Sequence, residues 1–346
     1  MPKPEQWHGR PAHEQPRQSW HGRPAHELLS SALETLGIYA VAGLLLLAGV
    51  FVSPDFPTPE NLMNVLGAVA LLGITASGMA FVTYSGSMAD LSVPSIMAFS
   101  GIITVAALPL GLTAALALGM LAGLAVGAMN GFVVGRLNAN PILWTLSVAF
   151  FMEGFMRFVW SNNQLYPDTE PGTPGGAFIN LFRLGLGPVP LVVAVMFLLF
   201  LAGHLLMTRT RFGRESRLVG SSRAAALTAG VRVPRVVFLN FLVAAFTASV
   251  AGVFLASMNK LGVFYLGQGY DFKAVTAVVI GGVMLSGGRG RLFGVLGGVL
   301  VIGLLSNIMQ FLGVTTFRQN IVTGVVFIAV VGFQQRRLRL KGRDYA

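Results

Sequence analysis

The chain has 346 residues, of which 54% are hydrophobic and only 11% are charged. Soluble domains carry about 25% charged residues, so this composition, with a mean hydropathy of +0.71, excludes an ordinary water-soluble protein. The net charge of +11 comes from arginines that cluster between and after apolar runs, and membrane topology explains them better than nucleic-acid binding does. Because cysteine is absent, a disulfide framework, a thiol nucleophile and a cysteine metal site are excluded.

A polar tail occupies residues 1–33 and contains the octapeptide WHGRPAHE twice. Four of the five histidines lie in this tail: His8, His13, His21 and His26. A metal site is conceivable, but a duplicated polar tail without fixed geometry is the favoured interpretation. We therefore expect a disordered cytoplasmic tail followed by a retained first span, because the tail is too long for the n-region of a signal peptide.

Ten apolar runs follow, and they predict an all-α polytopic membrane protein. The runs lie at 36–53, 64–84, 93–109, 111–135, 141–160, 188–207, 236–257, 272–285, 292–313 and 318–334, with boundaries uncertain by about 2–4 residues. The predicted transmembrane region thus extends over 34–335, and a basic tail covers 336–346.

The charges between the runs predict the orientation. Residues 161–188 are rich in proline, glycine and asparagine and carry a single arginine, which is typical of an external loop. If ten spans alternate, Arg136, the basic loop 208–235 and both tails fall on the cytoplasmic side, as the positive-inside rule requires. We expect both termini in the cytoplasm.

The apolar runs contain an internal repeat. The segment from Asp90 to Gly101 resembles the segment from Asp271 to Gly282, and the sequence around Asn130 resembles that around Asn307 at a nearly equal offset. Spans two to five therefore match spans seven to ten, and because five spans separate the equivalents, the two halves have inverted topology. Inverted halves are a recurring transporter architecture.

Both segments led by an aspartate are short. At about 1.5 Å per residue, the run from Asp271 to Leu285 does not cross a hydrocarbon core of about 30 Å. Interrupted spans at matching positions in two halves indicate a translocation path, and a short span buried within the protein is an equally open interpretation.

Motifs for catalysis are missing from the sequence. It has no GxxxxGK[ST], HExxH, GxSxG or paired carboxylates, and Gly287–Gly290 lacks the strand and the Lys-Ser/Thr pair of a phosphate loop. We expect neither ATPase nor hydrolase activity, and no enzyme function, in this chain.

The loop 208–235 carries seven arginines and one acid. Within it, Ser222 is a good N-cap, helix-forming residues follow, and Gly230 is a typical terminator, so a helix is predicted over Ser222–Ala229. Such a helix could lie on lipid headgroups or could serve as a docking site, and the residues alone favour neither.

Four ordered motifs carry a resemblance to a known family. Asp90–Val93 resembles the motif DLSVG, Thr210–Arg214 resembles T-x-FGR, Gly220–Gly230 resembles GGN-x-x-AA-x-x-AG, and Ala277–Gly290 resembles AVVLGG followed by L-x-GG-x-G. Over residues 36–335 the chain resembles the permease subunits of ATP-binding-cassette (ABC) importers for ribose, arabinose, galactofuranose and similar sugars.

The sequence departs from the family pattern at a few positions. Pro94 replaces a glycine, which the first turn of a helix tolerates, and Ser222 replaces an asparagine, an acceptable capping change. Glu153 stands where many members have arginine. An ion pair with Arg157 one turn later is the favoured interpretation, and exposure to a polar path is the alternative.

The resemblance implies a subunit of the bacterial cytoplasmic membrane without cofactors of its own. Two permease subunits would form the pore, cytoplasmic ATPase subunits would consume ATP, and a periplasmic or tethered binding protein would deliver the sugar. The ATPase-coupling residues would be Arg211, Arg214, Ser222, Arg223, Ala225, Ala226 and Gly230.

The candidate residues of the path are polar or aromatic positions within apolar spans. They are Asp90, Ser92, Asn130, Trp144, Asp271, Asn307 and Gln310. For the three amides, interhelical hydrogen bonding is favoured over contact with substrate, and Trp144 could pack or stack on a sugar.

Two other functions remain open at this point. The same machinery could carry branched-chain amino acids, nucleosides or a furanone signal. Alternatively, an ion-coupled secondary transporter could use Glu153, Asp271 or Lys273, although carboxylates within the spans are sparse.

Overall fold

The computed structural model describes residues 25–186 and 189–343, with side chains placed within 36–185 and 189–336. The first copy of WHGRPAHE and most of the second lie outside the described residues, as do His8, His13 and His21. His26 lies in the first turn of the first helix, but its side chain is outside the part for which side chains are described, and so is the question of a metal site in the tail. Helix α1 (Ala25–Val52) begins before the expected end of the tail at residue 33, because the helix-forming sequence AHELLSSALE continues the apolar run toward the N-terminus.

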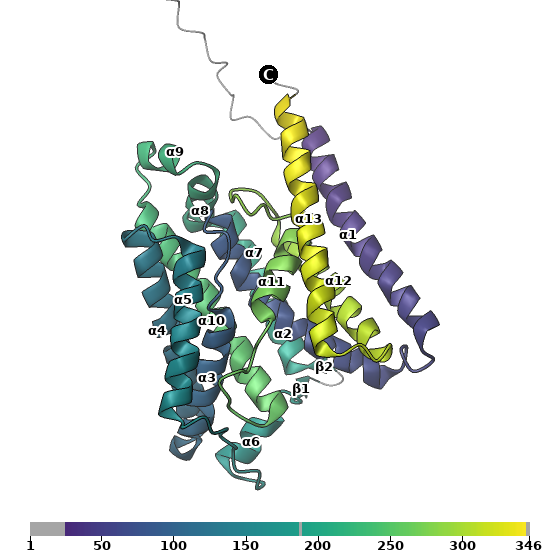
Figure 1. Ribbon diagram of the computed structural model, residues 1–346, viewed down its shortest axis with the longest axis vertical. Helices are drawn as coiled ribbons and strands as arrows, with labels where there is room; N and C mark the ends of the chain where they lie inside the picture. The colour runs from purple at the N-terminus through teal and green to yellow at the C-terminus, as the bar shows by residue number, and fades with distance from the viewer. Residues whose placement is uncertain (1–24, 187–188, 344–346) are drawn as a thin grey trace, which may run out of the picture.

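The described residues are almost entirely helical (Figure 1). After α1 come α2 (Pro59–Tyr84), α3 (Val93–Ala107), a 3-10 turn η1 (Leu108–Leu110), α4 (Leu112–Arg136), α5 (Pro141–Val159), α6 (Pro174–Asn180), α7 (Leu191–Arg209), α8 (Arg211–Ser221), α9 (Arg223–Thr228), α10 (Val233–Asn259), α11 (Tyr270–Ile280), α12 (Leu292–Phe311) and α13 (Thr316–Arg343). The predicted external loop, 161–188, contains α6 and the strand β1 (Gly185–Leu186). Strand β1 forms a two-residue antiparallel pair with β2 (Val189–Pro190), which lies just after that loop.

Eight helices of the described part are long and apolar enough to cross a membrane, which confirms the polytopic all-α class. The two other predicted spans are shorter. The apolar part of α1 covers Leu36–Val52, and α11 has only 11 residues, so the short eighth span of the sequence is a partial helix.

Each aspartate-led segment lies at the start of a short helix, α3 with 15 residues or α11 with 11, which is entered from non-helical chain. The chain leaves α2 at Tyr84, runs without helix to Asp90, and enters α3 with Pro94 in its first turn. In the second half, residues 260–269 precede α11, and Gly269 adopts a left-handed conformation (φ 83°) at its N-cap. The two helix starts have different local signals, because a proline in the first turn marks the start of α3 and a glycine with positive φ marks the start of α11.

The packing of the two halves is reciprocal. Helix α10 packs against α3 and α4 of the first half, and α2 packs against α11 and α12 of the second, while α2 and α10 contact each other at the centre. In both halves the partial helix packs on the helix that follows it, α3 on α4 and α11 on α12. This arrangement is what a duplication of spans two to five as spans seven to ten predicts.

Small residues allow the central helices to approach closely. Glycines recur at every fourth position of α4 (Gly119, Gly123, Gly127, Gly131 and Gly135), and an added Cβ on the last four would meet atoms of α10. This is a tandem form of the small-xxx-small pattern by which membrane helices pack. Most of α2 is buried, whereas very little of the apolar part of α13 is buried.

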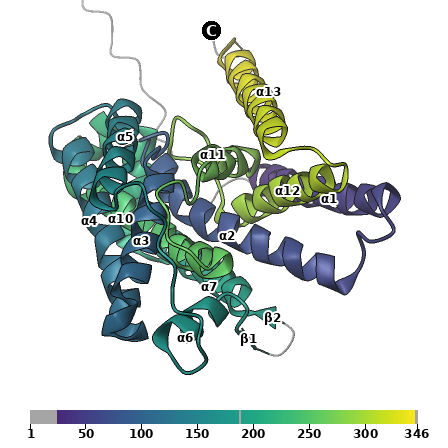
Figure 2. The same cartoon turned by 60° about the horizontal axis from the view of Figure 1, so that its bottom comes forward.

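The two ends of the molecule differ. Figure 1 shows α8, α9 and the C-terminal part of α13 at one end, and α6 with the β1–β2 pair at the other. Turned by 60°, Figure 2 shows α1, α12 and α13 as a group set apart from α3, α4 and α5. The basic loop and the end of the chain thus share one face of the membrane region.

Candidate functional site

The first candidate site lies where the extended segment before α3 meets α4 and α5. Asp90 is fully buried, and its Oδ1 accepts hydrogen bonds from the Ser92 amide (2.9 Å) and the Ser92 hydroxyl (2.6 Å). This short local motif closes the turn that starts α3. The other carboxylate oxygen, Oδ2, has no hydrogen-bond partner among the described residues.

A chain of hydrogen bonds extends from this turn across two helices. Asn130 of α4 donates from Nδ2 to the Ser92 hydroxyl (2.7 Å), and Trp144 of α5 donates from its indole N–H to Asn130 Oδ1 (3.0 Å). Four predicted path residues thus form one connected chain, Trp144–Asn130–Ser92–Asp90. The side-chain amide of Asn130 thus makes interhelical hydrogen bonds, which is the interpretation favoured from the sequence.

The fifth candidate, Asp271, lies nearby in the first turn of α11. It lines a small cavity of about 140 Å³ together with Leu91, Pro94 and Ser95 at the start of α3. The two partial helices therefore begin on either side of one cavity, as their equivalent places in the repeat suggest. Glu153, Tyr265 and Gln268 also line the cavity.

The last two candidates lie elsewhere. Asn307 exchanges side-chain hydrogen bonds with Asn61, near the start of α2 (3.1 and 3.4 Å), and Gln310 is exposed. The structure does not bring either residue to the cavity. Asn307 thus occupies the place that corresponds to Asn130 in the repeat, but it contacts a different element.

Other residues at this site did not stand out in the sequence. Thr145 Oγ1 accepts from the Leu91 amide (2.9 Å), and Ser95 donates to the Ala149 carbonyl (3.1 Å), so both bonds fix α3 to α5.

Glu153 forms the expected ion pair with Arg157 (2.9 Å). The Arg157 guanidinium also lies 3.8 Å from the centroid of the Phe264 ring, which ties α5 to the segment that precedes α11.

The second candidate site is the basic loop, which folds into two helices. The predicted helix is present as α9: the Ser222 hydroxyl accepts from the Ala225 amide (3.2 Å), and Gly230 follows with φ 74°. The helix α8 was not predicted. Its signal is the threonine cap, because Thr210 Oγ1 accepts from the Gly213 amide (3.2 Å).

The side chains of this loop divide into an exposed set and a buried set. Arg211, Arg214 and Arg223 are exposed; Arg211 pairs with Glu215 (2.6 Å), and Arg223 donates to Asn138 Oδ1 (2.6 Å) beyond the end of α4. In contrast, Ala226 is fully buried in an apolar cluster that includes valines of α2, α4, α8 and α10: Val82, Val134, Val219 and Val236.

Helix α8 contacts both halves of the repeat at one point. Gly220 lies against the Tyr84 carbonyl at the end of α2 and against the Gly288 amide in the turn between α11 and α12, and a Cβ at Gly220 would overlap the first and come within 2.5 Å of the second. The Gly288 amide itself donates to the Tyr84 carbonyl (3.0 Å). Three backbones thus converge where only glycine fits.

Comparison with known proteins shows which family has this architecture. Residues 61–331 match the family described as the branched-chain amino acid transport system / permease component. The ribose import permease protein RbsC of Bacillus subtilis (strain 168) is 34% identical over 309 residues, which cover 88% of this chain and 94% of that protein.

Two further relatives give the same result. The L-arabinose transport system permease protein AraH of Escherichia coli (strain K12) is 31% identical over 307 residues, covering 88% of this chain and 92% of that protein. The ribose import permease protein RbsC of the same strain is 32% identical over 283 residues, covering 81% and 87%. The chain is a multi-pass membrane protein that belongs to the family described as the branched-chain amino acid transport system / permease component.

Proposed function

We propose that this chain is the permease subunit of an ABC importer that moves a monosaccharide across the bacterial cytoplasmic membrane. The observation that carries the proposal is the exposed α8–α9 unit that packs on both inverted halves. Similarity to ribose and arabinose permeases over most of each chain favours a sugar over an amino acid, a nucleoside or a furanone, and favours an ATP-driven importer over an ion-coupled transporter.

The α8–α9 unit is the proposed docking site for a separate cytoplasmic ATPase. It presents the exposed Arg211, Arg214 and Arg223 together with Leu227, whose side chain is 61% exposed. Arginine is among the residues that are enriched at interaction hot spots. If the ATPase docks here, the loop would lie on the cytoplasmic side, as we also propose for both termini.

The contacts of α8 and α9 suggest how displacement would reach the path. Gly220 touches the end of α2 and the turn before α12, and Ala226 lies in the cluster shared with α4 and α10. A push on this unit would therefore move one half relative to the other. Movement of inverted halves about a central site is the usual basis of alternating access.

The small cavity at the start of α3 and α11 is the proposed contact region for the cargo. Asp271, Ser95, Tyr265 and Gln268 offer donors and acceptors suited to sugar hydroxyls, and the Trp144–Asn130–Ser92–Asp90 chain holds α3 in place beside it. A second copy of a permease subunit would complete the pore, and a periplasmic or tethered binding protein would deliver the sugar. This chain needs no catalytic residues or cofactors, because ATP is consumed by the partner.

The test uses proteoliposomes that hold the permease, its ATPase and its binding protein. We expect uptake of labelled ribose or arabinose to require ATP and to continue when a protonophore and a sodium ionophore collapse the ion gradients. Uptake that stops with the gradients while ATP is held constant would refute the ABC mechanism and favour ion coupling. A thermal-shift screen of the binding protein separates the sugars from the other cargoes.

Charge reversal tests the docking site. Loss of an interfacial arginine costs about 2 kcal/mol or more at a hot spot, so Arg214→Glu and Arg223→Glu are each expected to weaken ATPase co-purification by roughly thirtyfold. The matched control is Arg183→Glu, an exposed arginine on the segment before β1, at the end of the molecule opposite α9. Equal loss in the control would refute the assignment of the α8–α9 unit.

A further inference from the structure

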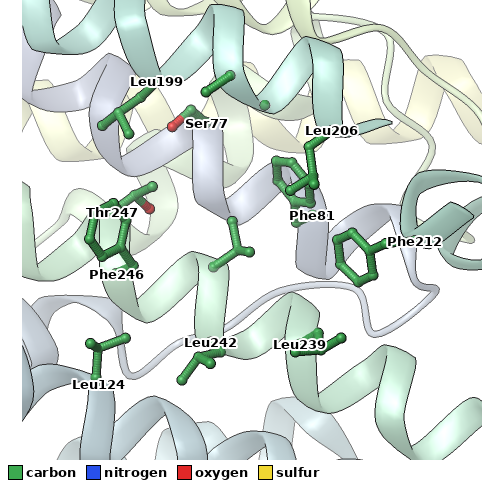
Figure 3. A pocket seen from close by; sticks show the side chains of 13 residues that line it. Ser77, Phe81, Leu124, Leu199, Leu206, Phe212, Leu239, Leu242, Phe246 and Thr247 are labelled. Atoms are coloured by element: carbon green, nitrogen blue, oxygen red, sulfur yellow. The ribbon is translucent and has the colours of Figure 1, made fainter. Parts of the chain in front are cut away.

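A large apolar groove lies apart from the proposed sugar path. It has a volume of about 620 Å³ and is bounded by α2, α4, α7, α8 and α10. Figure 3 shows its lining: Phe81, Leu206, Phe212 and Leu239 gather at one end, and Leu124, Leu199 and Phe246 at the other. Its volume lies within the range of about 300–1,000 Å³ that is typical of small-molecule sites.

The lining has no free polar capacity to offer a sugar. Of the 13 lining residues only Ser77 and Thr247 carry hydroxyls. The Ser77 hydroxyl donates to the Ile74 carbonyl (2.7 Å), and the Thr247 hydroxyl donates to the Ala244 carbonyl (3.0 Å). Both groups are thus satisfied within their own helices, and the groove presents hydrocarbon. A hydroxyl-rich solute would lose hydrogen bonds there, whereas an acyl chain would not.

Two exposed arginines continue the lining at the α8 end. On α7, Arg209 follows Leu206 by three residues, and on α10, Arg235 precedes Leu239 by four, so each lies one turn beyond the groove on the same helix face. Both are exposed, and neither forms an ion pair with another described residue. The groove is therefore apolar along its length and has two positive charges beyond its α8 end.

This combination matches a phospholipid with an anionic headgroup. We propose that the groove binds one acyl chain of an anionic phospholipid such as phosphatidylglycerol, with its phosphate between Arg209 and Arg235. The chain would lie against Phe212, which belongs to α8 and stacks on Phe81 of α2 (centroids 6.3 Å apart). The bound lipid would thus form part of the surface on which α8 rests.

The test is photocrosslinking of the full-length chain in nanodiscs with a lipid that carries a diazirine on its acyl chain. One arm uses phosphatidylglycerol, and another uses phosphatidylcholine with the same chains. Each arginine near an anionic surface contributes roughly fivefold to affinity, so labelling of peptides containing Leu206, Leu239 and Phe246 is expected to be at least about tenfold stronger with phosphatidylglycerol. Inorganic phosphate is added in a separate arm. If the arginines form only a simple anion site, phosphate would occupy that site without changing the acyl-chain label.

Two variants and a matched control for each sharpen the test. Ala202→Phe fills the groove from α7 and is expected to abolish the preferred labelling, whereas Ala40→Phe makes the same change at an exposed position of α1 and is expected to leave it intact. The double variant Arg209→Gln/Arg235→Gln keeps the groove and is expected to equalise the two lipids, and Arg336→Gln on α13 is its control.

Two results would overturn the proposal. Equal labelling with both lipids over all lipid-facing helices would mean that the groove holds only bulk lipid. Unchanged labelling in Ala202→Phe would mean that the label does not come from the groove. Because the readout is crosslinking of the isolated chain, neither result depends on sugar transport or on the ATPase.

Discussion

The Ser92 hydroxyl is the most informative single group to remove. It donates to buried Asp90 (2.6 Å) and accepts from Asn130 of α4 (2.7 Å), so Ser92→Ala breaks the chain that joins α3 to α4 and α5. The Ser92 amide still donates to Asp90, and the turn itself is retained. The variant therefore tests the side-chain network and leaves the local fold in place.

The two lost hydrogen bonds set the expected loss of unfolding free energy. A hydrogen bond to a carboxylate contributes about 1.5–3 kcal/mol, and an interhelical bond in a membrane protein contributes about 0.6–1.7 kcal/mol. Ser92→Ala should thus lower the free energy of unfolding by roughly 2–5 kcal/mol. Because Asp90 then keeps a single donor, α3 should also lose its defined position beside the cavity, and transport should fall.

The assay is equilibrium unfolding in mixed micelles with increasing sodium dodecyl sulfate. Ser100→Ala is a matched control, because Ser100 is also buried on α3 but its hydroxyl has no partner among the described residues. We expect no loss of unfolding free energy in the control, because a buried hydroxyl without a partner contributes no hydrogen bond. In a double-mutant cycle, Ser92→Ala and Asn130→Ala should couple by about 0.6–1.7 kcal/mol.

The reasoning would be refuted if Ser92→Ala and Ser100→Ala destabilised the protein equally. It would also fail if the cycle with Asn130→Ala showed no coupling, because the two side chains would then not interact in the folded protein.

Three further predictions concern the same contacts. Trp144→Phe keeps the ring but removes the donor to Asn130, and should cost about 1–2 kcal/mol in the same unfolding assay; a stabilised variant would argue against the bond. Gly220→Ala places a methyl group against the end of α2, and overpacking of about 1–3 kcal/mol should appear as a lower Tm and weaker ATP-driven uptake, whereas an unchanged Tm would contradict the close approach. Glu153→Gln breaks a partly exposed ion pair with Arg157, and such pairs are worth only about 0.3–0.5 kcal/mol, so a loss of unfolding free energy much above 1 kcal/mol would show that Glu153 has another partner.

Features that depend on neighbouring residues could be predicted from the sequence. The helix α9 with its Ser222 cap and the positive φ of Gly230 are present as expected, because caps and terminators act within a few residues. The ion pair between Glu153 and Arg157 was expected for the same reason, since residues four apart meet on a helix. Helix α8 escaped prediction because its charged sequence lacks an apolar run, although its Thr210 cap was visible.

Relations between distant helices were decided only by the tertiary structure. Asn130 and Asn307 occupy equivalent places in the repeat, yet one bonds to Ser92 and Trp144 and the other to Asn61. Sequence periodicity does not distinguish these outcomes, because lipid and protein interior are equally apolar and hydropathy does not set the rotation of a helix about its axis. The small polar cavity and the apolar groove also depend on how each helix is rotated about its axis, so only the tertiary structure shows them.

The sequence by itself determined that this is a helical membrane protein with a duplicated, inverted plan and a basic loop carrying a capped helix, because composition, run length and local capping dictate these features. Only the tertiary structure decided that Gly220 of that loop meets Tyr84 of one half and Gly288 of the other. The physical reason is that a backbone approach this close depends on the three-dimensional course of three separate segments. In the sequence, each of them shows only a glycine or the end of an apolar run.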